Sequence, residues 1–107
     1  MSQLNLKTTL SAAQSSDDAF TSASFDLMNV DKIVVTAGLT TGGAPTGGLT
    51  LEVSEDKANW VAFGDLGTLA VPLVTSGLCF RYGRVKVAAV VEGVTYDLVS
   101  RAMAIGE

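Results

Sequence analysis

The chain has 107 residues but contains no histidine and only one tryptophan. Histidine is the side chain most often used as a general base, and it is also the commonest metal ligand. No serine, lysine or carboxylate shows the spacing of a nucleophile with a neighbouring base. We therefore predict that the protein is not an enzyme, and that it uses no metal ion or other cofactor.

Cysteine is almost as scarce, because Cys79 is the only one in the sequence. A single cysteine cannot form a disulfide within the chain, so the fold must be stabilised by packing. Cys79 lies within an apolar run, where a buried and inert thiol is the expected state.

Basic residues are also few: seven lysines and arginines stand against eleven aspartates and glutamates, for a formal net charge of -4. They are scattered rather than gathered into a stripe, so nucleic acid is not an expected partner. No apolar run approaches the roughly 18 residues that span a bilayer, and the first residues lack the order of a secretion signal. We expect synthesis in a cytoplasm and no membrane partner.

Apolar residues, by contrast, are abundant. They make up 48% of the chain, against 17% charged residues, and the mean hydropathy is +0.38. A small domain has difficulty covering this much apolar surface by itself, so part of the surplus is expected to contact another chain. The length suits one domain spanning residues 1–107.

Apolar and polar residues alternate with a period of two over residues 4–10, 23–27, 49–54 and 85–91, which predicts half-buried strands. Residues 33–39 are apolar at both parities, as in a strand that is buried on two sides. No window keeps a helical period over three turns. The sequence predicts an all-β fold: a single-domain antiparallel β-sandwich of about eight strands, either jelly-roll or Ig-like.

Two segments interrupt the alternation. Residues 11–19 are small and polar and predict a loop or flexible arm, and residues 38–48 form a glycine-rich loop. The glycine-rich loop has neither a P-loop nor a dinucleotide-binding pattern, so contact is its expected role. Glu92-Gly93 stands between two apolar strands and predicts a tight hairpin. The apolar pair Leu98-Val99 breaks the alternation, which indicates either a bulge or burial on both sides.

The acidic and polar stretch SEDKAN, residues 54–59, could be a turn, a sugar site or a calcium site. Its neighbourhood supplies oxygen ligands from Glu52, Glu55, Asp56, Asn59 and Asp65. The regular spacing of a dedicated calcium loop is missing, so we expect solvated carboxylates and no bound metal. The tryptophan that follows, Trp60, is expected to be part of the core together with Tyr82, Val85 and Val87.

Residues 66–77 offer no polar face, and Pro72 would place a strand there at a sheet edge. An exposed apolar edge promotes aggregation unless another chain covers it. The expected contact residues are Leu69, Val71, Pro72, Leu73 and Val74. Arg84 and Lys86 share the parity of Tyr82, so they form either a solvated sheet face or a second contact.

SEDKANW (54–60), GLCFRYGRVKVAA (77–89) and GVTYDL (93–98) resemble a pattern of small β-sandwich virion proteins from tailed bacteriophages: S-x-D-G-x-x-W followed by F-R-Y-x-R-V-x-V. The pattern is also similar to strands of discoidin-like carbohydrate-binding sandwiches. The resemblance implies that Ser54 and Asp56 bend a turn and that Trp60 packs across the sandwich beside Tyr82. Lys57 replaces the usual glycine, so Asn59 is expected to take the left-handed conformation.

From this resemblance we expect a structural protein of the virion, made in the host cytoplasm. The leading interpretation is a capsid decoration or cement protein that forms a homo-oligomer, expected to be a trimer, and binds the major capsid protein. The alternative is a carbohydrate-binding module, or the receptor-binding part of a tail fibre or baseplate. Exposed aromatic rings would favour the alternative.

Overall fold

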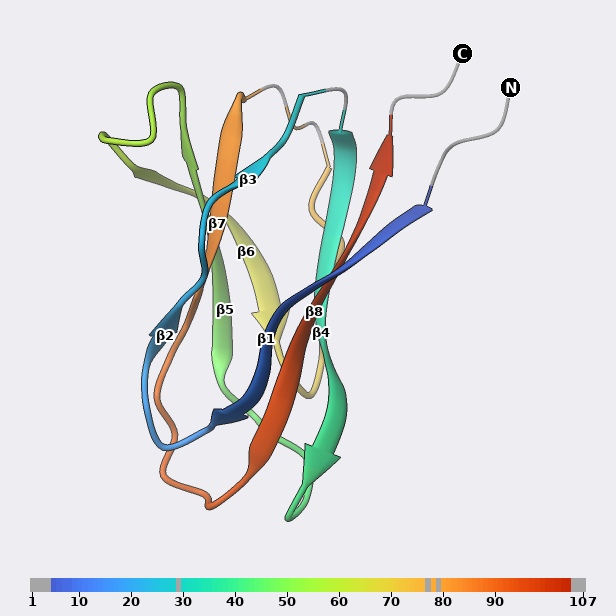
Figure 1. Cartoon of the computed structure of the whole chain (residues 1–107), viewed down its shortest axis with the longest axis vertical. Coiled ribbons are helices and arrows are strands. Elements are labelled where there is room, and N and C mark those ends of the chain that lie inside the picture. Colours follow the sequence, from blue (N-terminus) through green and yellow to red (C-terminus); the bar gives the residue numbers. More distant parts are fainter. Residues whose placement is uncertain (1–4, 29, 77, 79, 105–107) are drawn as a thin grey trace.

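The computed structural model describes residues 5–28, 30–76, 78 and 80–104, and it confirms the all-β sandwich. Eight strands occur in this part of the chain, all in antiparallel pairs (Figure 1). Their bounds are β1 (Asn5–Ser15), β2 (Phe20–Thr21), β3 (Phe25–Asp26), β4 (Val30–Thr41), β5 (Gly48–Ser54), β6 (Val61–Thr68), β7 (Tyr82–Val87) and β8 (Thr95–Ala104). Within these described ranges no helix has the length and apolarity needed to cross a membrane.

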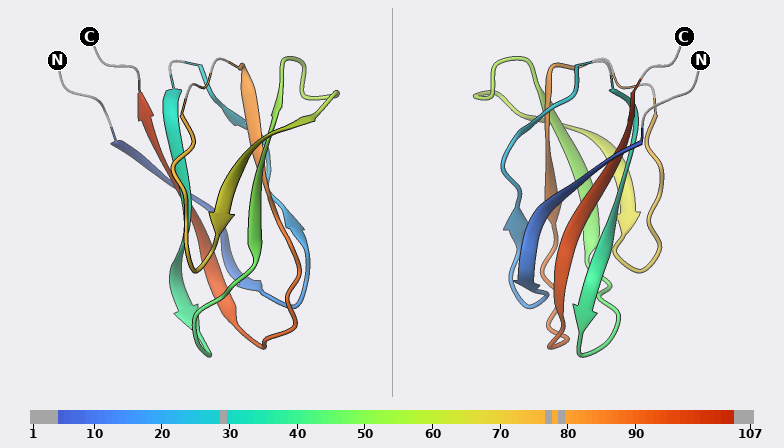
Figure 2. Two further views of the ribbon diagram at one scale, coloured as in Figure 1. Left: turned by 180° about the vertical axis from the view of Figure 1, so that it is seen from behind. Right: turned by 45° about the vertical axis from the view of Figure 1, so that its right-hand side comes forward.

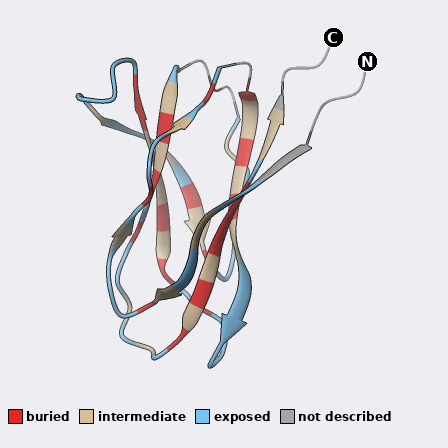
Figure 3. Cartoon of the chain, viewed as in Figure 1, coloured by how far each residue is buried: buried red, intermediate tan, exposed pale blue. Residues whose placement is uncertain are grey.

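The strands form two sheets that face each other (Figure 2). One sheet has the order β1-β8-β4, and the other has the order β2-β7-β5-β6 with β3 also paired to β7. Every second residue of β5 is buried in the core, and the residues between them point outwards, as the period-two alternation predicts. Buried and partly exposed residues alternate in the same way along several strands in Figure 3.

The strand that is buried on both faces is β8 rather than β4. We expected residues 33–39 to be buried on two sides, but β4 lies at the edge of its sheet and Leu39 is 73% exposed. The central strand β8 instead buries Leu98, Val99 and Ser100 in succession. The register of β1 against β8 shifts beside Leu98 and Val99, but the extra residue is Leu10 of β1. Of the two predicted alternatives, burial on both sides is therefore the one that occurs in β8.

The hairpin predicted at Glu92-Gly93 is wrong, because β7 and β8 belong to different sheets. The turn itself exists, and Gly93 has a positive φ of 66°. Its backbone is fixed by the distant Asp17, whose Oδ1 accepts hydrogen bonds from the N–H groups of Glu92 and Gly93 at 3.1 and 3.0 Å. Residues 88–94 therefore cross from one sheet to the other.

The edge strand expected within residues 66–77 is also absent beyond Thr68, where β6 ends. The chain turns back, with Thr68 N donating to Val71 O and Leu73 N donating to Leu66 O, both at 3.0 Å. Gly67 has a φ of 81°, and a side chain there would clash with the Val71 carbonyl. The segment then forms an isolated bridge between Thr75 and Ile33 of β4, so it closes one side of the sandwich.

The two predicted irregular segments are shorter than expected. Ser11 to Ser15 belong to β1, with Ala13 at a φ of 53°, and Gly38 to Thr41 belong to β4. Only residues 16–19 and 42–47 lie between strands at these places. Cys79, which we expected to be buried, lies outside the described residues.

Candidate functional site

The SEDKAN stretch is a hairpin turn that joins β5 to β6, as predicted. The Ser54 hydroxyl oxygen accepts hydrogen bonds from the N–H groups of Asp56 and Lys57 at 3.1 and 2.9 Å. Lys57 itself takes the left-handed conformation, with a φ of 65°, so the expectation that Asn59 would do so is wrong. Asn59 contributes instead by donating from Nδ2 to Asp56 Oδ2 at 2.7 Å.

The Asp56 carboxylate is occupied by its own turn. The backbone N–H groups of Asn59 and Ala58 donate to Oδ1 at 2.8 and 2.9 Å. These two bonds, in that order, are the main reason that the pKa of Asp56 lies well below its ordinary value. The ionised carboxylate therefore stabilises the turn.

The other residues weighed as calcium ligands have separate partners. Glu55 Oε2 accepts a hydrogen bond from Arg81 N at 2.8 Å, and Asp65 Oδ1 accepts one from Gly67 N at the same distance. Glu52 pairs with Arg84. The oxygens of this neighbourhood are thus distributed over several contacts instead of converging on one point.

The outer face of β7 carries Tyr82, Arg84 and Lys86 in a row, at the shared parity that the sequence indicates. Arg84 Nε lies 2.6 Å from Glu52 Oε1, and Lys86 Nζ lies 4.0 Å from Glu52 Oε2. The Arg84 guanidinium also lies over the ring of Trp60, 4.4 Å from its centroid. Both basic residues are therefore engaged within the chain.

Trp60 and Tyr82 are half-buried on the outer face rather than in the core, where we expected them. Val61 pairs with Val53 in the sheet, so the residue before it lies on the opposite side of the strand. The indole Nε1 of Trp60 donates to Lys57 O at 3.2 Å.

Two cations flank the ring of Tyr82. Lys57 Nζ and Arg81 Cζ lie 4.7 and 5.3 Å from the ring centroid. The parity that Tyr82 shares with Arg84 already indicated an outward position. Of the four expected core residues, only Val85 and Val87 are buried.

The buried aromatic residue is Tyr96 of β8, which sequence reasoning missed. It is 0% exposed, and its hydroxyl has no hydrogen-bond partner within the described part of the chain. Burial raises the pKa of this phenol. Tyr96 has the same parity as the buried Val94 and Leu98, and this alternation is the sequence signal that indicates its burial.

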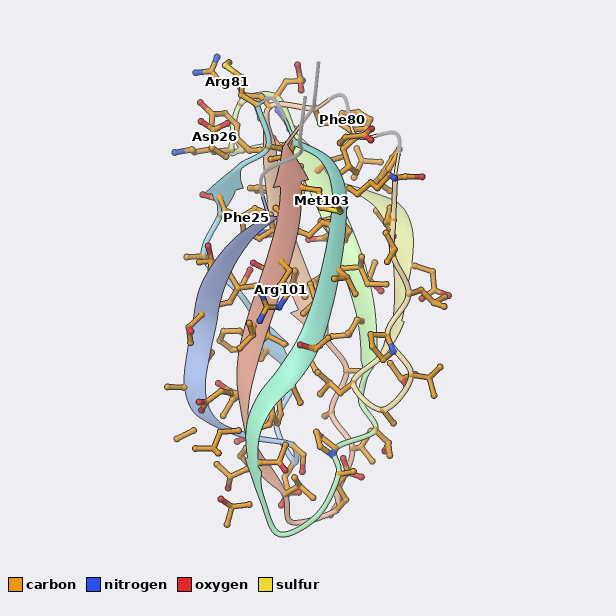
Figure 4. The ribbon with its side chains drawn as sticks, turned by 90° about the vertical axis from the view of Figure 1, so that its right-hand side faces the viewer. Phe25, Asp26, Phe80, Arg81, Arg101 and Met103 are labelled. Carbon is orange, nitrogen blue, oxygen red and sulfur yellow. The ribbon has the colours of Figure 1, made fainter. Side chains whose placement is uncertain are left out.

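The expected contact residues that follow β6 divide into two groups. Leu69 is buried, whereas Val71, Leu73 and Val74 are 66%, 48% and 61% exposed, and Pro72 is exposed too. We call residues 71–74 the apolar loop. Val74 borders a small cavity of about 80 Å³ on the outer side of the three-stranded sheet. Arg101 and Met103 of β8, labelled in Figure 4, also line this cavity.

An apolar cleft lies at the end of the sandwich where β5 turns into β6, and the sequence did not reveal it. Its volume is about 310 Å³, and Phe63 and Phe80 form part of its wall with their ring centroids 4.8 Å apart. Val61 is 64% exposed and Phe63 is 40% exposed. The remaining lining residues are Val53, Ser54, Glu55, Asp56 and Asn59.

A broader trough of about 660 Å³ lies over the outer side of β5. Small residues, among them Gly48, Thr50 and Ala62, leave this space open. Charged groups from Glu52, Asp65 and Lys86 border it.

No protein-family model matches the sequence, and no curated protein matches it either. The solved structures that match this chain include the following two. The SPBc2 prophage-derived protein YomS has a TM-score of 0.58 and 9% identity, with 97% of this chain and 98% of that chain covered. CpGH89CBM32-5 from Clostridium perfringens, solved in complex with GalNAc-β-1,3-galactose, has a TM-score of 0.46 and 12% identity, with 97% and 100% covered.

Proposed function

We propose that the chain is a non-enzymatic structural protein of a bacteriophage virion, a capsid decoration or cement protein that self-associates and binds the major capsid protein. The observation that carries this proposal is the apolar loop, whose Val71, Leu73 and Val74 are largely exposed at the side of the sandwich. Full burial of one such side chain contributes about 1.5 to 3 kcal/mol. Covering all three at once would therefore favour association strongly.

The loop suits a copy of the same chain because none of its four residues is charged. If the loop lies at a three-fold axis, the same apolar residues of all three copies meet there, so no unpaired charge would be buried. A trimer is the assembly we propose, with the remaining surface free for the major capsid protein. The absence of histidine from the sequence is the basis for proposing no catalytic role.

Two similarities support the placement in a virion. Residues 54–98 resemble small sandwich proteins of tailed phages, and the fold is similar to that of a prophage-derived protein over nearly the whole chain. Synthesis in the host cytoplasm followed by incorporation into the particle is consistent with a fold that needs no disulfide.

The test is the double substitution Val71→Asp with Leu73→Asp, followed by sedimentation velocity over micromolar concentrations. We expect an oligomer for the wild-type chain and a monomer for the variant, because two carboxylates would resist burial in the contact. The matched control places aspartate at Leu39 and Val91, which are 73% and 87% exposed. This control should keep the oligomer.

Attachment is measured next by mixing each protein with phage capsids that lack it and recovering the particles. We expect the wild-type chain and the control to bind, and the variant to bind less. A wild-type chain that sediments as a monomer and does not attach to capsids would refute the proposal.

The trough over β5 favours a second candidate, the carbohydrate-binding role. Its mixture of carboxylates, a hydroxyl and an ammonium group could bind sugar hydroxyls. The aromatic rings give this candidate less support, because cations already lie over Trp60 and Tyr82. Saturable binding on a glycan array, abolished by Asp65→Ala, would establish it over the structural role.

A further inference from the structure

The cleft between Phe63 and Phe80 is open because little stands opposite the end of the β5–β6 hairpin. The hairpin turn projects away from the three-stranded sheet in both views of Figure 2. Val61 pairs with the buried Val53, yet it is 64% exposed. Phe80 is the aromatic residue that covers this end, and Figure 4 shows it at the same end as Arg81.

β6 is the last strand of its sheet, and within the described ranges no strand pairs with its edge away from β5. On the side away from β5, backbone groups of Leu66 and Thr68 bond to the returning chain, and the Thr75 hydroxyl donates to Asp65 O at 3.2 Å. Among the described residues, no backbone hydrogen bond satisfies residues 61–64 on that side. A free strand edge beside an apolar cleft is the arrangement by which extended peptides are bound through strand addition.

The two charged side chains that line the cleft are both carboxylates. Glu55 and Asp56 line it, whereas the neighbouring Lys57 lies over Tyr82 on the outer face of the hairpin. Asp56 and Ser54 use their oxygens within the turn, so the cleft itself offers mainly apolar contact. A side chain that enters it needs no hydrogen bond, and a cation beside that side chain would meet the two carboxylates.

We propose that this end of the molecule binds an extended segment of another protein chain, which adds to the edge of β6, places one aromatic or branched side chain in the Phe63–Phe80 cleft, and carries a lysine or arginine next to it. The site is distinct from the apolar loop. The inference rests on the geometry of the hairpin and does not require that the protein belong to a virion.

The probe is the acetylated and amidated pentapeptide Lys-Val-Phe-Val-Lys, titrated into the uniformly 15N-labelled full chain. We expect saturable shifts of the amide signals of residues 53–63 and of Phe80. Replacing the peptide's phenylalanine with alanine should weaken binding about tenfold or more, because the cleft loses its anchor. Replacing both lysines of the peptide with glutamate should also weaken binding. This loss should become larger as the salt concentration falls, because repulsion between the carboxylates is then less screened.

The protein variant Val61→Arg should also weaken binding of the pentapeptide about tenfold, because the longer arginine side chain would fill the cleft. The matched control Val91→Arg alters an exposed valine in the connection between β7 and β8 and should bind like the wild-type chain. The peptide substitutions test the site even if Val61→Arg does not fold.

Three outcomes would overturn the inference: no saturable shifts, shifts spread over the whole molecule, or equal binding of the glutamate peptide. Self-association at this site would overturn it as well. In that case the signals of residues 61–64 would shift as the protein concentration rises without peptide, and Val61→Arg would abolish this shift, because a second copy of the chain would be the occupant. The apolar-loop variant that disrupts self-association should still bind the peptide, so failure of either proposal can be distinguished from failure of the other.

Discussion

Two turns of this molecule use the same chemistry, a buried serine and an exposed aspartate that bind backbone N–H groups, but they act over different distances. In the β5–β6 turn, Ser54 and Asp56 bind groups no more than three residues away. In the crossing between the sheets, Ser16 and Asp17 bind groups of residues 92–94, more than 70 positions along the chain. The first pair shapes a local hairpin, whereas the second attaches separate segments to each other.

Of these four side chains, Ser16 should cause the largest loss of folding stability when its hydroxyl is removed. It accepts a hydrogen bond from Val94 N at 3.0 Å, and both residues are buried. Ser16→Ala leaves that N–H without a partner, which costs about 1 to 3 kcal/mol. Denaturant unfolding followed by tryptophan fluorescence measures the loss, and a variant as stable as the wild-type chain would show that water replaces the hydroxyl.

Ser54→Ala is the matched substitution in the local turn, and we expect a smaller loss of about 0.5 to 1 kcal/mol. The N–H groups of Asp56 and Lys57 that it frees belong to exposed residues, so water can bind them. The same unfolding measurement applies. A cost equal to that of Ser16→Ala would contradict the difference between the local and the long-range turn.

Acid should weaken both turns. Hydrogen bonds from the N–H groups of Gly93 and then Glu92 lower the pKa of Asp17, and those from Asn59 and then Ala58 lower that of Asp56. A carboxyl with a lowered pKa stabilises the fold above its unfolded pKa of about 3.9, and this stabilisation is lost as the pH falls from there through the folded pKa.

Melting temperatures measured from pH 6 down to pH 2 test the acid effect. Asp17→Asn and Asp56→Asn should each reduce the dependence on pH, because asparagine keeps an acceptor oxygen but carries no titrating charge. If the double variant retains the full pH dependence of the wild-type chain, other carboxylates are responsible.

The smallest effect is expected for Tyr96→Phe, which removes a buried hydroxyl that has no partner among the described residues. Losing an unsatisfied polar group should leave stability unchanged or raise it by at most about 1 kcal/mol. Unfolding of this variant is the control for Ser16→Ala, since both remove one buried oxygen. A loss above about 1 kcal/mol would reveal a hydrogen bond to the Tyr96 hydroxyl.

The sequence by itself determined the all-β class, the alternation of β5 and the turn at residues 54–59, because each depends on neighbours within a few positions. Only the tertiary structure decided that residues 88–94 cross between sheets, that the chain turns back after Thr68, and that β8 is the strand buried on both faces. Pairing partners lie tens of residues apart, and period-two alternation is the same whichever strand lies opposite.

The candidate sites divide in the same way. The exposed apolar residues 71–74 could be predicted from composition alone, since no polar face was available there. The Phe63–Phe80 cleft could not, because Phe80 reaches β6 from a segment far along the chain. The position of Trp60 directly after the turn and the resemblance to phage sandwich proteins indicate the core. The strand that begins at Val61 instead fixes its side, and Arg84 from β7 covers its ring.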